Sequence, residues 1–473
     1  MRMGAKTKKL FLLPLLLTPL LFGCGEEEDI EITWWVKFLA PSNVKDESTR
    51  NDPNYASWWA IQDIIKGFEA LHPHIHVKEI AYANDPAIAS AVDSAMLHRD
   101  LLPNMASTYG TYAFNWKDAL IDVTEKGKAL EEDSDFIQSI LTAEAQQYGG
   151  NKYYSLPFSK SGEALVYKVN DWNEAKKVPQ SFAELMEEAK AIKAAHPEIY
   201  GDDVQRNPAG KLLACPIIYK DPANLFFTAC ESIGAKVVAS KDEKEEALLF
   251  NNSLAKDIVK QLKKWSNEGL LTTKKHTAKD LVEIFNEGKA EYVITSTANV
   301  QDMLSEETLV RFQKVPAWNA KSQRRVISQG PSICFFDKDD REDQAALLFY
   351  DHLINGENTA LFSKSTGYLP LRAGAYTMPE IAKEVYASKF KGASKDSTLA
   401  EKDLAYMGDV LLLNDEYAKG NNYFMSEVCS WSGALRSQIE SIIVNVFNDH
   451  SAVSEEEINA LVESEFLRAR YSI

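Results

Sequence analysis

The amino-acid sequence predicts an α/β protein, and three observations indicate this class. Strand-like and helix-like segments alternate near the start of the chain, an order typical of a largely parallel sheet covered by helices. The chain has 473 residues, of which 45% are hydrophobic, so it is long enough for two lobes with a core each. After the N-terminal segment, no apolar run approaches the length of a membrane span.

The first elements follow one another closely. Ile30–Val36 is a short β-rich run, and residues 58–71 place apolar side chains on one face of a helix that the next His-Pro pair stops. Ile75–Ala81 alternates as a second strand, and residues 86–97 begin a second helix with a proline. This order favours parallel pairing of the two strands.

Later segments continue the alternation. Residues 149–167 have the composition of a strand, a turn and a strand, and residues 181–195 form an amphipathic helix that begins with Ser181 and Glu184 as a capping box. Further helices are expected at about 254–268, 278–286 and 341–353, and extended segments at 290–294 and 325–336.

The first residues of the chain are typical of an export signal. A basic start precedes an apolar run over residues 10–22, and the run closes with the sequence Leu-Phe-Gly-Cys. This ending resembles the lipobox of bacterial lipoproteins. The resemblance implies that residues 1–23 are a lipoprotein signal peptide and that the acylated Cys24 begins the mature chain. An ordinary secretory signal with a chance cysteine at its end is the alternative.

Residues 24–29 are mostly acidic and are expected to form a solvated tether. Several acyl chains on one residue give stable anchoring. The predicted location is therefore outside the cytoplasm, with the membrane contacted through the lipid anchor only.

Charge and cysteine content restrict the classes of partner. A formal net charge of −17 argues against nucleic acids and anionic membrane surfaces, because both need clustered Lys and Arg. The four cysteines besides Cys24 lack metal-ligand spacing, and their even number is compatible with disulfides or with buried free thiols. These four are Cys215, Cys230, Cys334 and Cys429.

Common enzyme motifs are absent from the sequence. It contains no G-x-S-x-G, no H-E-x-x-H, no Walker loop and no dinucleotide-binding loop, so we expect no catalytic residues and no cofactor. His72, His74 and His76 alternate and could bind a transition metal from one strand face. Pro73 disrupts the start of that strand, and neither a fourth ligand nor a second shell is evident, so we expect no metal site.

Aromatic residues are the other candidates for a site. Trp34 and Trp35 lie at the carboxyl end of the first strand, and Tyr109 follows a Pro-Asn pair. Open α/β sheets present ligand sites at strand ends, and flat rings there can stack on the C–H faces of a sugar. Core packing is the alternative for each ring.

Several local patterns together identify a family. They are FEALHPHIHV (68–77), LPN (102–104), YSLPF (154–158), LVY (165–167), VPQSFAEL (178–185), FNEGKA (285–290) and TGYLPLR (366–372). With these patterns the chain resembles the extracellular solute-binding lipoproteins of ABC importers, in the carbohydrate and glycerol-phosphate branch. The resemblance covers nearly the whole mature sequence.

The resemblance implies a two-lobe periplasmic-binding-protein fold of type II, with mixed sheets flanked by helices and a hinged ligand cleft. Bound solute would favour closure because it contacts both lobes only when they are shut. The implied first lobe is 30–158 and 296–336, and the second is 159–295 and 337–473. The implied crossings lie near 158–162, 294–297 and 336–339.

The resemblance also assigns ligand-binding positions, with Tyr109 and Ser161 on one side of the cleft or its hinge and Tyr368 on the other. The full set is Trp34, Trp35, Tyr109, Ser161, Phe226 or Phe227, Ser296, Asn299, Gly330, Ser332, Tyr368, and Trp431 or Arg436.

Two departures from the family pattern bear on the ligand. Glycerol-phosphate binders carry an acidic residue at the start of the helix after the second strand, where this sequence has Ala87 with Asp85 close by. The sequence also lacks the glycine-dense turn that usually precedes the C-terminal arginine. An oligosaccharide or a sugar derivative is therefore the expected ligand.

The predicted function is that of a monomeric, lipid-anchored receptor that captures a small-molecule solute and delivers it to the permease subunits of an ABC importer. Two other classes stay open. One is a surface glycan-acting enzyme with two carboxylates, for which acidic residues are plentiful. The other is an adhesin or a structural lipoprotein on the same fold.

Overall fold

The computed structural model describes residues 28–473 except 39, 43–45, 151, 175, 202–212, 274–280, 300 and 378–391. The predicted signal peptide, Cys24 and most of the acidic tether lie outside the described residues. Within the described part, no helix is both long and apolar enough to cross a membrane.

The first lobe is built on a five-stranded sheet with the order β2-β1-β3-β11-β4. Its first three strands run parallel, with Ile30 opposite Ile75 and Trp34 opposite Met105, whereas β11 is antiparallel to β3 and β4. The strands are β1 (Ile30–Val36), β2 (Ile75–Ala81), β3 (Met105–Thr108), β4 (Leu156–Pro157) and β11 (Ser332–Phe335). The helices are α1 (Ala56–Leu71), α2 (Asp85–Ala95), α3 (Gly110–Asn115), α4 (Thr124–Glu132), α5 (Gln138–Gln147), α12 (Asp340–Leu353) and α13 (Gly356–Thr366).

The second lobe is built on a sheet with the order β7-β6-β8-β5-β9, in which β5 is antiparallel to both neighbours. The strands are β5 (Glu163–Val169), β6 (Ile217–Tyr219), β7 (Leu271–Thr273), β8 (Tyr292–Ser296) and β9 (Leu309–Lys314). The helices are α6 (Phe182–Ala195), α7 (Pro197–Tyr200), α8 (Pro222–Ser232), α9 (Lys244–Ala247), α10 (Ser253–Asn267), α11 (Leu281–Asn286), α16 (Ser432–Asn448) and α17 (Glu455–Ser472).

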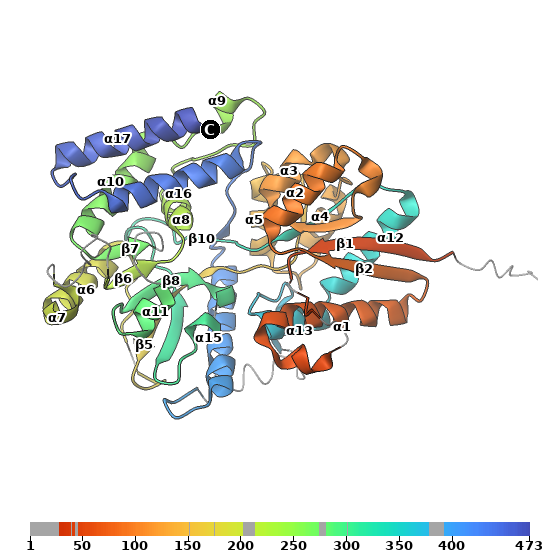
Figure 1. Ribbon diagram of the computed structural model, residues 1–473, viewed down its shortest axis with the longest axis horizontal. Coiled ribbons are helices and arrows are strands. Elements are labelled where there is room, and N and C mark those ends of the chain that lie inside the picture. The colour runs from red at the N-terminus through yellow and green to blue at the C-terminus, as the bar shows by residue number, and fades with distance from the viewer. Residues whose placement is uncertain are drawn as a thin grey trace, which may run out of the picture.

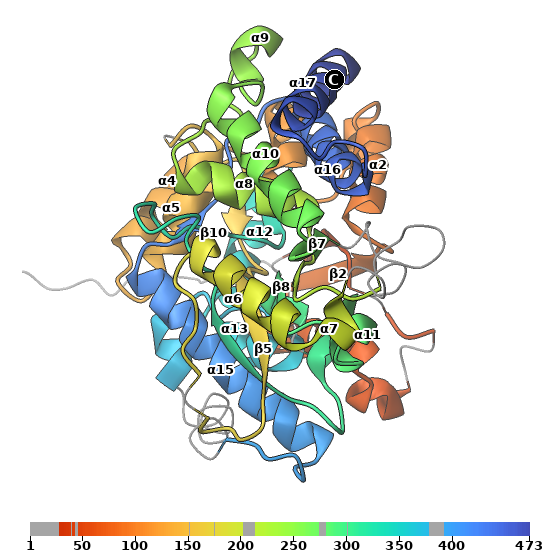
Figure 2. The same cartoon turned by 90° about the vertical axis from the view of Figure 1, so that its left-hand side faces the viewer.

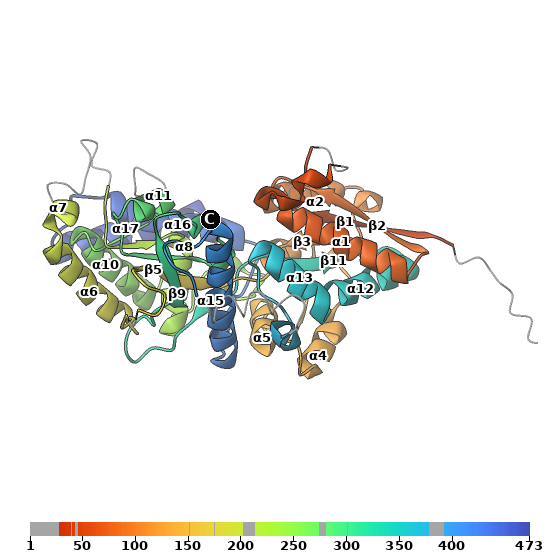
Figure 3. The same cartoon turned by 90° about the horizontal axis from the view of Figure 1, so that it is seen from below.

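The two lobes lie side by side, with the long helix α15 (Leu399–Lys419) between them (Figures 1 and 3). A small parallel pair, β10 (Val326–Ile327) and β12 (Tyr423–Phe424), joins the connecting segments. Short 3-10 helices complete the chain: η1 (Glu47–Asn51), η2 (Pro53–Tyr55), η3 (Arg99–Leu101), η4 (Lys117–Ala119), η6 (Thr297–Asn299), η7 (Gln301–Met303) and η8 (Ala373–Thr377).

Most elements predicted from sequence are confirmed. The strands Ile30–Val36 and Ile75–Ala81 have the predicted bounds, and α1 buries the predicted apolar face except Leu71, which is exposed. Ser181 caps α6 as predicted, but Glu184 accepts from the backbone N–H of Gln180 and not from that of Ser181. The predicted strands of 149–167 are β4 and β5, which belong to different sheets.

Only the first of the three predicted crossings is confirmed, since β4 and β5 lie on either side of residues 158–162. The crossing predicted at 294–297 is wrong, because β8 is followed by β9, which pairs with β5 in the same sheet. The chain instead returns to the first lobe after β9, through β10 to β11.

The crossing predicted at 336–339 is also wrong. Helix α12 packs against β1, and α13 packs against α1, so both helices cover the first lobe. The chain reaches the second lobe again between η8 and α15, partly outside the described residues. The strand 309–314 therefore belongs to the second lobe and the helices 340–366 to the first, contrary to the predicted division.

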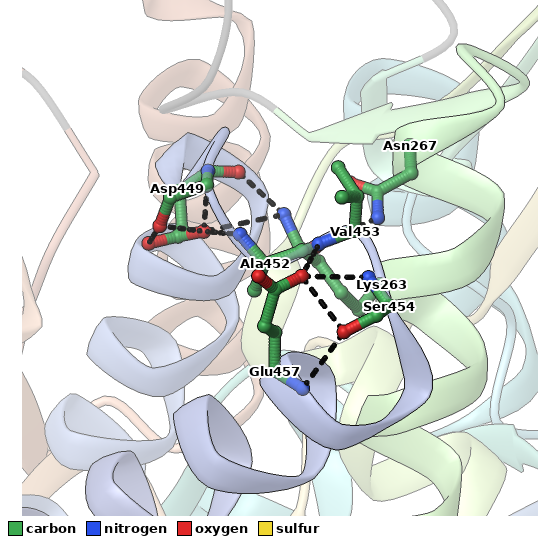
Figure 4. Close-up of polar contacts among 8 residues, drawn as sticks. Lys263, Asn267, Asp449, Ala452, Val453, Ser454 and Glu457 are labelled. Atoms are coloured by element: carbon green, nitrogen blue, oxygen red, sulfur yellow. Dashed lines mark hydrogen bonds and ion pairs between the residues drawn. The ribbon is translucent and has the colours of Figure 1, made fainter.

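Helices α8, α10, α16 and α17 gather at one end of the second lobe (Figure 2). The turn between α16 and α17 is fixed to α10 by polar contacts (Figure 4). The buried Lys263 donates to the carbonyl oxygen of Asp449, and Asn267 Nδ2 donates to the carbonyl oxygen of Ala452 at 2.9 Å. Ser454 and Glu457 then form the capping box of α17. These contacts hold the helix pair as one unit.

A buried ion pair lies where the crossings meet. Lys160 Nζ is 3.0 Å from Glu144 Oε2, and neither side chain is exposed to solvent. Lys160 Nζ also donates to Ser332 Oγ at 2.6 Å and to the carbonyl oxygen of Gly330 at 3.3 Å. One ammonium group therefore joins α5, the first crossing (residues 158–162) and the second crossing, which is the segment that leads through β10 to β11.

Gly330 lies against the first crossing so closely that a side chain has no room. Its φ is +89°, and a Cβ atom there would lie 1.8 Å from the carbonyl oxygen of Ser159. Gly150 has a similar φ of +86° but no atom within 4 Å of a Cβ. Comparing an alanine substitution at Gly330 with one at Gly150 therefore separates the free-energy cost of the backbone conformation from that of a steric clash.

We expect Gly330→Ala to lower the free energy of unfolding by about 4 kcal/mol or more, because the backbone of the two crossings must move apart. Gly150→Ala is the control and should cost about 1 to 2 kcal/mol. Urea unfolding of both variants measures the difference. Equal losses would show that the crossings are not packed as described.

Candidate functional site

A chamber of about 460 Å³ lies between the two lobes. Its first-lobe wall includes Asp85, residues 109–112 and Gln147, and its second-lobe wall includes Asp221, Asn224, Phe227 and Arg436. The connecting segments 327–329 and 425–428 close the remaining side. Because three parts of the chain contribute, a molecule bound here would contact both lobes and the segments that join them.

Four helices begin at the chamber, because each follows a turn that places its first residues in the wall. These helices are α2, α3, α8 and α16. The starts of α2 and α8 share the sequence Asp-Pro-Ala, at residues 85–87 and 221–223. Each follows a strand that ends at the chamber side of its sheet, β2 or β6. Helix starts carry unpaired backbone N–H groups, so the walls offer donors as well as side chains.

On the first-lobe side, Lys37 forms an ion pair with the wall residue Asp85, with Nζ and Oδ2 3.1 Å apart. The other oxygen, Asp85 Oδ1, is buried and has no hydrogen-bond partner among the described residues. Burial alone would lower the pKa of Lys37, but nearby Tyr368, Tyr109 and Asp85 outweigh it and raise the pKa. Lys37 therefore stays charged beside an acceptor that a ligand hydroxyl could use.

Tyr109 stands next to this pair. The Lys37 ammonium lies 5.9 Å from the centre of its ring. Burial raises the pKa of Tyr109 to about 12, against the opposing effect of Lys37. Its hydroxyl therefore remains protonated at neutral pH and can both donate and accept a hydrogen bond.

On the second-lobe wall, Arg436 contacts both carboxylate oxygens of Asp221 at 3.2 Å and donates to Asn224 Oδ1 at 2.6 Å. Asn224 in turn donates to Glu163 Oε1 at 2.9 Å. A chain of polar contacts thus leads from the chamber to Glu163, the first residue of β5.

Glu163 is fully buried at the start of the hinge-side strand. Tyr219 donates to Glu163 Oε2, and Gln329 Nε2 of the second crossing donates to its Oε1 at 3.3 Å. Burial raises the pKa of Glu163 to about 7, although the hydrogen bonds from Tyr219 and Asn224 oppose the shift. Its protonation state therefore changes near neutral pH.

The chamber combines paired charges with rings from both lobes. Lys37 pairs with Asp85, and Arg436 pairs with Asp221, so the charges of these groups are largely compensated. The wall also presents the rings of Tyr109, Tyr112 and Phe227. Rings, hydroxyl groups and compensated charged groups suit an uncharged ligand with many hydroxyl groups.

Among the site residues predicted from sequence, Tyr109 and Arg436 line the chamber, and so does Phe227. Phe226, the alternative at that position, is fully buried against Phe466 and is not part of the wall. The reason is helical geometry, because adjacent residues of α8 point to different faces.

The prediction for Trp34 is wrong. Its ring has no exposed surface and packs edge-on against Phe158 and Phe349, inside the first lobe. Trp35 is 8% exposed and packs against Tyr82 on the opposite face of the sheet from Trp34. Both rings serve the core, and neither lines the chamber.

Several other predicted residues are not part of the wall. Ser161 pairs with Gln329 in the backbone, and its hydroxyl accepts from Ser296 Oγ at 3.1 Å. Gly330 and Ser332 contact the first crossing as described above, and Asn299 lies in η6.

Tyr368 and Trp431 are not among the wall residues of the chamber. Tyr368 stacks on Phe362 of the first-lobe helix α13 and lies beside Gly330, so it is on the same side as Tyr109 and not on the opposite side as predicted. Trp431 precedes α16 and is half-buried, next to the wall residues Ser432 and Gly433.

Sequence reasoning missed Asp85, Asp221 and Asn224 as wall residues, and Lys37 as the ion-pair partner of Asp85. A signal for two of them was present, because Asp-Pro after a strand is typical of a helix start at the carboxyl end of a sheet. Lys37 had no such signal.

The histidine and cysteine candidates are placed outside the chamber. His74 Nδ1 lies 3.3 Å from Asp29, and His76 Nδ1 lies 3.7 Å from Glu69, so the two rings face different carboxylates. The described residues contain no group of three His, Cys, Asp or Glu side chains arranged for a metal ion. Cys230, Cys334 and Cys429 are buried free thiols, as one alternative predicted, and Cys215 is also buried.

Comparison with known proteins gives one family and many similar structures. The model of the bacterial extracellular solute-binding protein family matches residues 63–388. No curated protein matches the chain. The solved structures below are 13 to 15% identical to the chain, so each shows similarity of fold.

UgpB from Mycobacterium tuberculosis, in complex with glycerophosphocholine, has a TM-score of 0.61 at 15% identity, over 94% of this chain and 98% of that chain. The cyclic alpha-maltosyl-1,6-maltose binding protein from Arthrobacter globiformis has a TM-score of 0.63 at 14% identity, over 93% and 99%. The sugar-binding protein MalE from Xanthomonas citri has a TM-score of 0.64 at 13% identity, over 93% and 98%. The two-lobe α/β fold is therefore shared across both lobes.

Glu163→Gln is expected to remove a pH dependence of stability. Because the pKa of Glu163 is raised from 4.5 to about 7 on folding, its contribution to stability is complete below pH 4.5 and is lost as the pH rises through about 7. This loss amounts to roughly 3 kcal/mol. Urea unfolding between about pH 5 and pH 8 should show a smaller decline for the variant than for the parent protein.

The control is Glu187→Gln, at an exposed side chain of α6 that pairs with Lys190. This control should follow the parent at every pH. Parallel stability curves for Glu163→Gln and the parent would contradict the raised pKa.

Proposed function

The chain belongs to the bacterial extracellular solute-binding protein family, and we propose that it captures a carbohydrate between its lobes as the receptor of an ABC importer. The chamber between the lobes carries this proposal. It is of a size for a small molecule, and its walls come from both lobes and from the connecting segments.

The chemistry of the walls supports a sugar as the ligand. Asp85 Oδ1 can accept a hydrogen bond from a hydroxyl group, Tyr109 can donate and accept, and Arg436 can donate. Phe227 and the two tyrosine rings offer apolar faces from opposite lobes. The sugar-binding proteins from Arthrobacter globiformis and Xanthomonas citri share the fold, which is consistent with this ligand class.

A glycerophosphodiester is the second candidate ligand. The acidic residue that glycerol-phosphate binders carry at the start of the second helix was missing from the aligned position, Ala87. In the structure, however, Asp85 begins α2 and lines the chamber. The similarity to UgpB, crystallised with glycerophosphocholine, is consistent with this candidate.

Binding without turnover is the proposed activity. The carboxylates Asp85 and Asp221 are each held in an ion pair, with Lys37 and Arg436. A glycosidase of the common type uses two carboxyl groups that flank the scissile bond, one as acid and the other as base or nucleophile. Because Asp85 and Asp221 are already engaged by cations, the ion pairs support a receptor over a surface enzyme.

The cellular arrangement follows from the proposed receptor function. We propose that the chain acts outside the cytoplasm as a monomer, that acyl chains on Cys24 anchor it to the membrane, and that it delivers its ligand to permease subunits. The lipobox-like ending of the export signal supports the anchor.

Maltotriose, maltotetraose and glycerophosphocholine should be tested by thermal shift and calorimetry. We expect at least one to raise the melting temperature, because a ligand that binds only the folded state stabilises it. Arg436→Gln should weaken binding of that compound by about 10-fold or more, since a hydrogen bond to a charged donor is lost.

The matched control is Arg470→Gln, at an arginine of α17 that pairs with Glu245 outside the chamber. This control should bind like the parent. No shift with sugars and a clear shift with glycerophosphocholine would select the second candidate, whereas turnover of a sugar would contradict the receptor.

Cys24→Ala is expected to release the exported protein from the detergent phase after phase separation, because the acyl anchor is lost. Western blotting of the two phases measures the distribution, with Cys429→Ala as a control at a buried thiol. If Cys24→Ala still partitions into detergent, the lipid anchor is contradicted.

A further inference from the structure

The lobes also touch beside the chamber, where residues 236–242 of the second lobe reach the first lobe. We call this segment the latch loop. Ser240 Oγ donates to the carbonyl oxygen of Gln147, at the end of α5, with a distance of 3.1 Å. Asp242 Oδ1 lies 3.3 Å from Lys117 Nζ in η4. Both contacts join residues of different lobes.

The second lobe holds the latch loop in place by backbone contacts. Leu249 N donates to the carbonyl oxygen of Val237 at 3.0 Å, and Ala239 N donates to that of Ala247 at 2.9 Å. The backbone N–H of Ser240 also donates to Glu427 Oε2 at 2.8 Å. These hydrogen bonds hold the latch loop against residues 247–249 and Glu427.

Gln147, on the first-lobe side of this contact, is hydrogen-bonded to residues of the hinge. The carbonyl oxygen of Gln147 also accepts from Val428 N at 2.8 Å. The Gln147 side chain is buried and donates to Glu144 Oε1 at 2.6 Å, and Glu144 pairs with Lys160 of the first crossing. The latch loop therefore closes on a residue whose position is fixed by the hinge ion pair.

We infer that Ser240 and Asp242 form a latch that favours the closed arrangement of the lobes before any ligand binds. Both contacts exist only when the lobes are together, so they stabilise the closed state and not the open one. A larger closed population lowers the cost of closing on a ligand and slows its escape. This inference goes beyond the proposed function, because the latch contacts join protein residues and do not depend on any ligand.

The expected effect of each contact is modest. A neutral hydrogen bond or an exposed ion pair typically shifts an equilibrium by up to about fivefold. Ser240→Ala removes the hydroxyl donor but keeps the backbone bond to Glu427, and Asp242→Asn removes the charge that faces Lys117. Each change should therefore raise the ratio of open to closed molecules by up to about fivefold, and the double variant by more.

The test is small-angle scattering of the purified, ligand-free protein, fitted as a mixture of closed and open molecules. The control is Asp257→Asn, which breaks the 3.2 Å ion pair with Lys260 inside α10. This ion pair lies within one lobe, so its loss removes no contact between the lobes. The double variant should have a larger radius of gyration than the parent and the control. High salt should open the parent and the Ser240→Ala variant but not the Asp242→Asn variant.

Melting temperatures separate opening from unfolding, because the latch contacts lie outside both lobe cores. The double variant should melt close to the parent. The inference is overturned if the parent is already open in solution, if the double variant scatters like the parent, or if Asp257→Asn opens the protein equally. Since no ligand is used, failure of the sugar proposal would leave this result intact.

Discussion

The buried ion pair between Lys160 and Glu144 is the contact on which the arrangement of the lobes depends. Its ammonium group reaches the second crossing through Ser332 and Gly330, while its carboxylate belongs to α5 of the first lobe. A buried pair of this kind adds little net stability, but removing one partner leaves an uncompensated charge and is strongly destabilising. The pair therefore acts as a positional constraint, because its loss would also remove the contacts that hold the two crossings together.

The chamber follows from this constraint. The crossings place β5 and its Glu163 next to the second-lobe wall, and Glu163 is linked through Asn224 to Arg436. On the opposite wall, Lys37 and Asp85 come from the end of β1 and the start of α2. The charges of these two ion pairs are thus compensated within each wall.

Gln147 connects these parts. Its side chain contacts Glu144 near the hinge, its carbonyl oxygen receives the latch loop, and it lies in the wall of the chamber. A movement at the hinge that displaced Gln147 would therefore change both the chamber wall and the contact between the lobes. Because a packed and hydrogen-bonded side chain has few alternative positions, such a link can separate two distinct arrangements of the lobes.

The sequence by itself determined the α/β class, the bounds of strands such as Ile30–Val36 and the family. These features rest on local periodicity and short motifs, which neighbouring residues define. Two wall residues, Tyr109 and Arg436, were implied by the family resemblance. Only the tertiary structure decided that Trp34 is core, that Phe227 and not Phe226 faces the chamber, and where the chain crosses between lobes. Periodicity shows that a face is apolar, but the partner that covers it is fixed by contacts between residues far apart in the chain, such as Trp34 with Phe349.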